Sequence, residues 1–326
     1  MVRLILRRIA SWFVMIVVAT NVTYLLASWF LDPRSNYRDT RPAPTEARID
    51  QALAPYNLDP TVPLAVRWWH WITGIVTRWD WGSSPTGSSV NAEIGYRALT
   101  SAELVLLASV LSVVIGVALG VVSALHQYRP SDRILQAMSV VLYNVPTVVA
   151  ALLLVLGAIR INDAVGHRVF FVTGDSSPDV TGFLPTLGDR VAHLILPTIC
   201  LTILGYVGYH LTQRSLLLDT INADFVRTAR ATGLTRSQAV RRHALRASLI
   251  PTATSVAFSI PAIFTGAVLT ESIFGWHGMG EYFSVTLNRN DVHGVVAVAA
   301  FGALMTAIGA ILADIATAFL DPRVRL

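Results

Sequence analysis

Six long apolar stretches constrain this 326-residue chain more than any other feature of its sequence. Each holds about 20 or more mainly apolar residues, the length that an α-helix needs to cross the hydrocarbon core of a bilayer. They cover residues 9–31, 101–125, 134–159, 191–211, 249–273 and 292–320. Charged residues make up only 14% of the chain, against about 25% in soluble domains. The sequence therefore predicts an all-α integral membrane protein with six transmembrane helices.

The distribution of arginine predicts which side of the membrane each loop occupies. Arginine is enriched in short cytoplasmic loops. One side of the predicted topology holds 14 of the 25 basic residues and only four acids, in residues 1–8, 126–133, 212–248 and 321–326. We therefore place both termini on the cytoplasmic side. The first apolar stretch follows Arg3, Arg7 and Arg8 like a signal peptide, but it is longer than the usual apolar region of 7–15 residues, so we expect an uncleaved helix.

The topology suggests three parts: the N-terminal tail and first helix (1–31), an extracytoplasmic segment (32–100) and a core transmembrane domain (101–326). The extracytoplasmic segment is rich in tryptophan, at Trp68, Trp69, Trp71, Trp79 and Trp81. Tryptophan favours the membrane–water interface because its apolar ring carries a polar N–H at one edge. We expect a helix that lies on the outer leaflet. A docking surface for an extracytoplasmic partner is a second interpretation, and the two are compatible.

The longest cytoplasmic segment, 213–248, lies between the fourth and fifth apolar stretches and is rich in arginine. We expect a short helix at 222–232, with Asn222 as its N-cap and Asp224 in its first turn, where an acid favours the helix dipole. Phe225, Val226 and Ala229 are spaced to form a small apolar face on this helix.

A glycine then interrupts the helical pattern. Gly233 suits the residue just beyond a helix C-terminus, because it adopts positive φ without strain. Thr235 is an expected N-cap for a second helix that runs through Arg246 toward Pro251. Two short helices joined by a glycine corner form a knob that a soluble partner can grasp. An arginine-rich amphipathic helix bound to anionic lipid is the alternative that composition leaves open.

The stretch from Asp224 to Pro251, DFVRTARATGLTRSQAVRRHALRASLIP, resembles the cytoplasmic EAA loop of ABC importer permeases, in the variant found in the peptide-importer branch. Arg227 stands where the general pattern has glutamate, as it does in that branch, and Thr232 replaces the branch's usual lysine. The resemblance extends to Leu196-Pro197, Glu271-Ser272-Ile273-Phe274, Trp276, Gly278, Gly280, Asp291, Asp314 and Asp321-Pro322-Arg323-Val324-Arg325. His277 stands where the family usually has proline. Together these positions cover most of the chain.

This resemblance implies a type I importer permease fold and one half of the translocation pathway of an ATP-driven oligopeptide or dipeptide importer. A homologous second permease would complete the pathway, one or two ABC ATPase subunits would provide energy, and an extracytoplasmic solute-binding protein would deliver peptide. The chain would lie among lipids of the cytoplasmic (inner) membrane of a bacterium, with no nucleic acid as partner. The residues that would couple to the ATPases are Asp224, Phe225, Val226, Arg227, Thr228, Ala229, Arg230, Gly233 and Leu234.

Other functional residues are predicted from the apolar stretches themselves. Polar or helix-breaking residues mark a candidate translocation path at Asn144, Pro146, Ser259, Pro261 and Thr265. Pro146 and Pro197 should kink or locally open their helices. Gly116 and Gly120 form a GxxxG pattern that predicts close helix packing. Asp314, within the last stretch, is a candidate ion-pair partner for an arginine of the cytoplasmic segment.

The chain lacks the G-x-x-x-x-G-K-[ST] pattern that cradles nucleotide phosphates, so we expect no ATPase activity in it. We predict no catalytic, cofactor or metal site. Nickel or glutathione import by the same family remains an alternative, although no cluster of metal ligands within the spans favours nickel. A secondary transporter driven by an ion gradient would need paired intramembrane acids and internal repeats, and a membrane-embedded enzyme would need convergent catalytic side chains. Neither pattern is evident.

Overall fold

The computed structural model describes the backbone of residues 2–38, 41–42 and 44–320, and the side chains of these residues except 2–6, 253–254, 257–266 and 312–320. The chain divides into two compact units. The first comprises residues 103–275 and the chain from residue 308 on, and the second comprises residues 2–102 and 276–307. Apart from one isolated bridge between Ser83 and Ser89, the regular structure of the described residues is helical.

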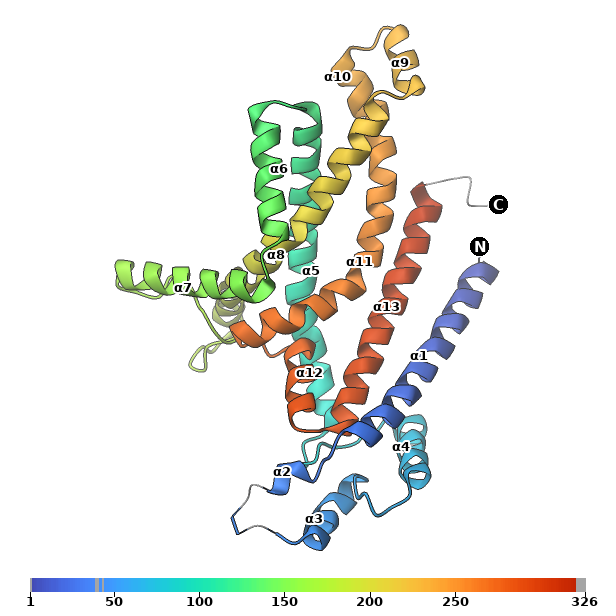
Figure 1. The fold of residues 1–326 in the computed structure, drawn as a ribbon, viewed down its shortest axis with the longest axis vertical. Helices are drawn as coiled ribbons and strands as arrows, with labels where there is room; N and C mark the ends of the chain where they lie inside the picture. The colour runs from blue at the N-terminus through green and yellow to red at the C-terminus, as the bar shows by residue number, and fades with distance from the viewer. Residues whose placement is uncertain (1, 39–40, 43, 321–326) are drawn as a thin grey trace. The chain divides into compact units, whose positions relative to one another are not determined.

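The first unit is a bundle of long helices with a pair of short helices at one end (Figure 1). Its elements are α5 (Val90–Leu125) from residue 103 on, α6 (Pro130–Tyr143), α7 (Thr147–Val165), α8 (Phe183–Ile221), α9 (Asp224–Ala231), α10 (Arg236–Ala239), a π-helical turn (Val240–Ala244), α11 (Leu245–Phe274) and the last part of α13 (Val292–Leu320). α8 has 39 residues, roughly 58 Å at 1.5 Å per residue, so it is longer than the hydrocarbon core. α9 and α10 therefore lie beyond the end of a helix that can cross a membrane with length to spare.

Residues 134–159 do not form the single helix expected from their apolar run. α6 ends at Tyr143, the residues from Asn144 to Pro146 are not helical, and α7 begins at Thr147 with Pro146 as its N-cap. Figure 1 shows α7 leaving the end of α6 in a different direction. Proline has no N–H to donate and disfavours helical geometry in the residue before it, which explains the break. Pro197, in contrast, lies inside α8 and does not end it.

Five helices of the described residues are long and apolar enough to cross a membrane: Arg7–Arg38, Val90–Leu125, Thr147–Val165, Phe183–Ile221 and Val292–Ile311. They overlap five of the six predicted stretches, although the third does so only in its second half. The remaining stretch, 249–273, lies in α11, whose side chains are described only in part.

The GxxxG pattern of α5 packs against α8, as predicted. A Cβ atom added to Gly116 would lie 2.6 Å from the carbonyl oxygen of Tyr206, and one added to Gly120 would lie 2.8 Å from that of His210. Real Cβ atoms do not approach oxygen so closely, so these two glycines allow the helix backbones to touch.

The second unit holds α1 (Val2–Phe30), α2 (Ser35–Arg38), α3 (Glu46–Leu53), a 3-10 turn (Ala54–Tyr56), α4 (Leu64–Arg78), the first residues of α5, α12 (Met279–Asn288) and α13 up to residue 307. Its core consists of Tyr24, Ala27, Ile49, Leu53, Leu58, Trp71, Val292, Val295 and Val296. Of the five tryptophans in this segment, Trp68, Trp69 and Trp71 lie in α4, and Trp79 and Trp81 follow its end. Trp71 belongs to a core that also includes α1 and α13.

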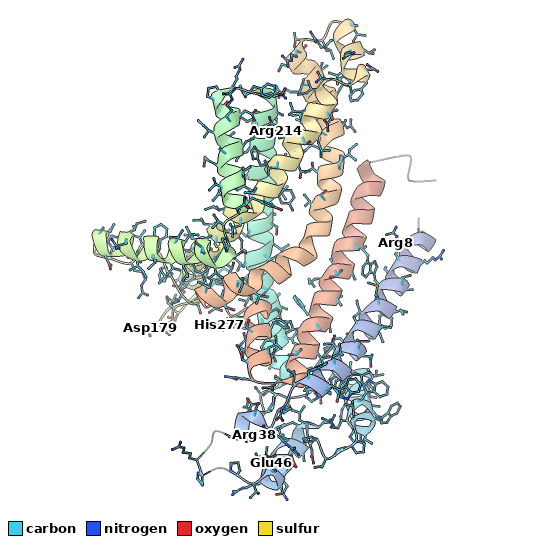
Figure 2. The ribbon with its side chains drawn as sticks, in the orientation of Figure 1. Arg8, Arg38, Glu46, Asp179, Arg214 and His277 are labelled. Carbon is cyan, nitrogen blue, oxygen red and sulfur yellow. The ribbon has the colours of Figure 1, made fainter. Side chains whose placement is uncertain are left out.

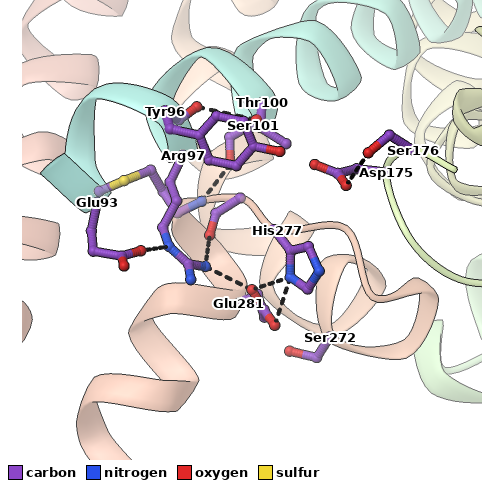
Figure 3. Close-up of polar contacts among 12 residues, drawn as sticks. Glu93, Tyr96, Arg97, Thr100, Ser101, Asp175, Ser176, Ser272, His277 and Glu281 are labelled. Atoms are coloured by element: carbon purple, nitrogen blue, oxygen red, sulfur yellow. Dashed lines mark hydrogen bonds and ion pairs between the residues drawn. The ribbon is translucent and has the colours of Figure 1, made fainter. Parts of the chain in front are cut away.

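Figure 3 shows an ion-pair network in this unit around Arg97 of α5. The guanidinium donates to Glu93 at 2.6 Å and to Glu281 of α12 at 2.7 Å. His277, at the position where the family usually has proline, lies 3.1 Å from the same Glu281 carboxylate. The neighbouring Trp276 is fully buried and donates its indole N–H to the carbonyl of Thr100 at 2.8 Å. Polar bonds from Trp276 and His277 therefore hold the turn before α12.

Candidate coupling segment

The arginine-rich segment between the fourth and fifth apolar stretches folds as two short helices around a glycine corner. α9 begins at Asp224 with Ala223 as its N-cap, and no side chain caps it. The expectation that Asn222 is the N-cap is therefore wrong: α8 extends to Ile221, and Asn222 is the C-cap of that helix.

Gly233 closes α9 with a Schellman motif. Its φ is +97°, its N–H donates to the carbonyl of Arg230 at 3.1 Å, and the N–H of Leu234 donates to the carbonyl of Ala229 at 3.4 Å. These two bonds satisfy carbonyls that the end of a helix leaves unpaired. The predicted role of Gly233 is confirmed.

The second helix begins as predicted. Thr235 accepts a hydrogen bond from the backbone N–H of Gln238, whose side chain in turn accepts from the N–H of Thr235, so the two residues form a capping box. α10 then passes through the π-helical turn at Val240–Ala244 directly into α11. The π turn was not predicted; such turns accommodate one extra residue within a helix.

Part of the segment packs against the bundle. The buried cluster comprises Ala124 of α5, Leu217 of α8, Val226 and Ala229 of α9, and Ala239, Val240 and Ala244. Small side chains here let the backbones approach closely. Phe225, which we placed on the same apolar face, is 48% exposed and lies outside the cluster. At 100° per residue, Phe225 is at the edge of the face that Val226 and Ala229 bury.

The rest of α9 faces outward. Asp224, Phe225, Arg227, Thr228 and Arg230 are all exposed. Asp224 and Arg227 lie 3.8 Å apart as a solvated pair, which stabilises the fold little. The outward face therefore combines one exposed aromatic ring with unshielded guanidinium groups, and the structure brings the nine predicted coupling residues together in one knob. We use the name coupling knob for residues 224–239.

Buried hydrogen bonds tie the two roots of the coupling knob to each other. Gln213 of α8 donates to Ser248 of α11 at 2.9 Å and accepts from Thr252 at 2.6 Å. All three side chains are buried, so these bonds are shielded from water. These bonds join α8 to α11 where the two helices enter the knob.

A buried ion pair ties α8 to the first turn of α6. Arg214 donates to both carboxylate oxygens of Asp132, at 2.8 and 2.9 Å. Figure 2 labels Arg214 on the bundle, below the end that carries α9 and α10. Asp132 is fully buried and also accepts from Ser123, from the Gln136 side chain and from the N–H of Tyr128. The hydrogen bonds from Arg214 are the largest cause that holds the pKa of Asp132 well below its usual value. The pair is therefore ionised at every physiological pH.

Sequence reasoning missed Asp132 and Gln213. Asp132 is the only acid in the short 126–133 loop, and Arg214 is the arginine closest to the end of the fourth span, so charge complementarity offered a signal for the pair. We had expected Asp314 to pair with an arginine of this region. The side chain of Asp314 lies outside the described residues, as do those of Ser259, Pro261 and Thr265. Asn144 and Pro146, the other two candidate path residues, are exposed at the break between α6 and α7.

The described residues contain no group of three or more His, Cys, Asp or Glu side chains arranged to hold a metal ion. The single cysteine, Cys200, is buried in α8.

Comparison with known proteins places the chain among membrane transport components. The family model for the binding-protein-dependent transport system inner membrane component matches residues 116–326. The oligopeptide transport system permease protein OppB of Mycobacterium tuberculosis (strain ATCC 25618 / H37Rv) is 40% identical over the full length of both chains. AppB, an oligopeptide transport system permease protein of Bacillus subtilis (strain 168), is 30% identical over 90% of this chain and 89% of its own. The dipeptide transport system permease protein DppB of Escherichia coli (strain K12) is 28% identical over 85% of each chain.

Proposed function

This chain belongs to the family of binding-protein-dependent transport system inner membrane components, and from that membership we propose that it is a permease subunit of an oligopeptide or dipeptide importer. The observation that carries this proposal is the full-length similarity to a protein named as an oligopeptide permease. The helical bundle with five candidate membrane spans supports it.

The proposed topology has six spans and both termini in the cytoplasm of a bacterial cell. Residues 1–31 would form the tail and first span, 32–100 an extracytoplasmic segment, and 101–326 the permease core with the coupling segment 213–248. The length of α8 supports this arrangement, because a 39-residue helix can cross the bilayer and still carry the coupling knob clear of the headgroups.

In the proposed mechanism, ATPase subunits grip the outward face of α9. Phe225 would enter an apolar pocket of the ATPase, while Arg227 and Arg230 meet acidic groups around it. Val226 and Ala229 transmit the displacement to α5 and α8 through the buried cluster. Because Gln213 holds α8 and α11 together and Arg214 holds α8 to the first turn of α6, movement of the knob would carry these helices as one body.

A homologous second permease would complete the pathway, and an extracytoplasmic solute-binding protein would release peptide into it. Asn144, Pro146, Ser259, Pro261 and Thr265 remain the candidate path residues. The break at Asn144–Pro146 supports its part of that assignment, because non-helical backbone at membrane depth is tolerated where it lines a cavity or is covered by protein.

Uptake of a labelled tripeptide by cells with and without this chain tests the proposal. We expect uptake to stop when ATP is depleted but to continue in the presence of an uncoupler. Unlabelled peptides should inhibit uptake of the labelled tripeptide, whereas nickel and glutathione should not. Loss of uptake with the uncoupler alone would favour an ion-gradient transporter. Competition by nickel or glutathione, but not by peptides, would favour a different cargo within the family.

Affinity purification of the tagged chain from its native membrane tests the assembly separately. A second permease, one or two ATPase chains and a solute-binding protein should copurify with it. Reproducible recovery of the folded chain alone would contradict the coupling mechanism.

A further inference from the structure

The outward face of α4 is apolar although the helix already buries its other face. Trp71 is 4% exposed and stacks on Tyr24 of α1 with 4.4 Å between ring centroids, and Gly74 on the same side is also buried. On the opposite side Val66, Trp69 and Val76 are exposed, the last two at 59% and 76%. A soluble helix keeps polar residues on its outer side, so this second apolar face needs a nonpolar neighbour.

The two threonine hydroxyls on this side of α4 make their hydrogen bonds within the helix. Thr73 donates to the carbonyl of Trp69 at 2.7 Å, and Thr77 donates to the carbonyl of Thr73 at 2.6 Å. A hydroxyl bonded in this way needs no water and tolerates a lipid environment. His70 lies at one edge of this face, and Arg78 is in the last turn of the helix.

The contact between α4 and α1 indicates the depth of α4. Trp68 donates its indole N–H to the side-chain oxygen of Asn21 at 2.7 Å, and the Asn21 amide donates to the carbonyl of Val17 at 2.8 Å. Asn21 thus has a partner for each end of its amide, as a polar group in a membrane span requires.

α1 continues past this contact for nine residues, roughly 14 Å of helix. Leu25, Leu26, Trp29 and Phe30 in this part are exposed large apolar side chains. If these lie in lipid, as the span requires, then α4 contacts α1 at a level inside the membrane and not in the water above it. Figure 1 shows α4 beside the C-terminal part of α1, so the exposed apolar side chains of the two helices belong to neighbouring elements.

We propose that α4 is inserted in the extracytoplasmic lipid leaflet, with Val66, Trp69, Thr73 and Val76 in contact with acyl chains and the Trp68–Asn21 bond fixing its depth on α1. This goes beyond peptide import: it assigns a lipid-binding surface to the first extracytoplasmic segment. The assignment of α4 to the extracytoplasmic leaflet rests on the orientation proposed above. The contact with lipid rests only on the exposed apolar side chains of α1 and α4 and on the contact between these two helices.

Spin-label accessibility tests this contact in the intact transporter in lipid nanodiscs. Cys200, which is buried, is replaced by alanine, and a single cysteine carrying a nitroxide is placed at Val76 of α4. Matched labels at Val18, exposed on α1, and Gln51, exposed on α3, serve as lipid and water references. The relaxation caused by oxygen, which partitions into lipid, is compared with that caused by a water-soluble nickel chelate.

We expect the ratio of oxygen-induced to nickel-induced relaxation at Val76 to match the ratio at Val18. It should exceed the ratio at Gln51 several-fold. A ratio like that at Gln51 would overturn the proposal. Low relaxation by both oxygen and the nickel chelate at Val76 would also overturn the proposal, because it would show that protein covers this face of α4. A further decrease in relaxation on addition of the solute-binding protein would identify that protein as the one that covers the face.

Tryptophan quenching by brominated lipid gives a second measurement that keeps Cys200 in place. Trp69→Phe should remove part of the quenchable emission, because Trp69 faces outward, whereas Trp71→Phe should remove emission that brominated lipid does not quench, because Trp71 is buried against Tyr24. Equal quenchable losses from the two variants, or none from Trp69→Phe, would contradict insertion.

Discussion

The coupling knob and the α4 region are both short amphipathic elements between long apolar helices, but they show opposite outer faces. α9 buries only the small side chains of Val226 and Ala229 and displays arginines with one aromatic ring. α4 buries large aromatic rings and displays further apolar side chains. The first face suits a soluble partner that brings acidic groups, and the second suits acyl chains.

The two regions are also fixed by different forces. The knob's roots are held by directional polar bonds, through Gln213 and through the ionised pair of Asp132 and Arg214. α4 is held to α1 mainly by the stacking of Trp71 on Tyr24, together with the indole hydrogen bond from Trp68 to Asn21. Hydrogen bonds and ion pairs are directional, so they fix the geometry of a segment that we propose to transmit displacement. Apolar contacts are less directional and allow a helix to adjust to the bilayer.

The largest effect is expected at the corner of the knob. Proline cannot adopt the positive φ of Gly233 and has no N–H for Arg230, so Gly233→Pro should abolish peptide uptake while the protein still inserts. The same result is expected when Phe225 and Ala229 are both replaced by aspartate. Gly233→Asn is the matched control, because asparagine tolerates this backbone and should retain most uptake. Normal uptake by the proline variant at normal expression would remove the knob from the mechanism.

The second largest effect tests the buried pair below the knob. Arg214→Met leaves the fully buried carboxylate of Asp132 without its main partner, which should cost about 3–5 kcal/mol of stability. Asp132→Asn combined with Arg214→Met should cost clearly less than the sum of the two single changes. Thermal unfolding of the purified complex measures both. Additive losses would show that the pair does not act as a unit.

Local signals in the sequence were sufficient to predict the backbone conformation of the coupling knob. Gly233 and Thr235 each determine a turn or cap within a few residues, so their roles follow from chemistry that neighbours in the chain supply. The position of Phe225 was not predictable in the same way, because a rotation of less than half a helical turn separates a buried from an exposed side chain, and only the packing of α5 and α8 decides it.

Long-range features were harder to predict. The run from 134 to 159 is mainly apolar, so its mean hydropathy hides the break at Asn144–Pro146, where the sequence predicts a kink or a local opening of the helix. The partner of Arg214 lies 82 residues away, and the periodicity of either helix carries no information on which acid it meets. The composition did indicate a tryptophan-rich helix, but the depth of α4 in the membrane could be inferred only from the contact between Trp68 and Asn21.

The third prediction separates the two regions by their response to pH. Burial raises the pKa of Asp291, which precedes α13 in the unit that holds α4, from 3.8 to about 6. The folded state therefore favours the neutral acid, so stability should fall by about 2–3 kcal/mol as pH rises from about 4 to 6 and stay flat above. Asp132 has a lowered pKa, so its contribution is lost only as pH falls below the usual carboxyl range and is constant in this window.

Asp291→Asn should remove that slope, because the amide cannot ionise and its oxygen still accepts from the N–H of Gly294, as the carboxylate does at 3.0 Å. Thermal unfolding between pH 4 and 8 measures the slope for both proteins. Identical slopes would show that Asp291 is ionised throughout the range and that the contrast between the two carboxyls is wrong.

The smallest effect compares two neighbouring tryptophans of α4. Trp68→Phe removes the indole N–H and leaves the oxygen of Asn21 without its donor, which should cost about 0.5–2 kcal/mol if that oxygen lies in lipid, where no water replaces the bond. Trp69→Phe is the matched control: it changes an exposed ring that donates no hydrogen bond to the protein in the described contacts, so its cost should be within about 0.5 kcal/mol. Thermal unfolding in nanodiscs measures the difference between the two variants. Equal costs would mean that water reaches Asn21, and α4 would then lie above the membrane and resemble the water-exposed coupling knob after all.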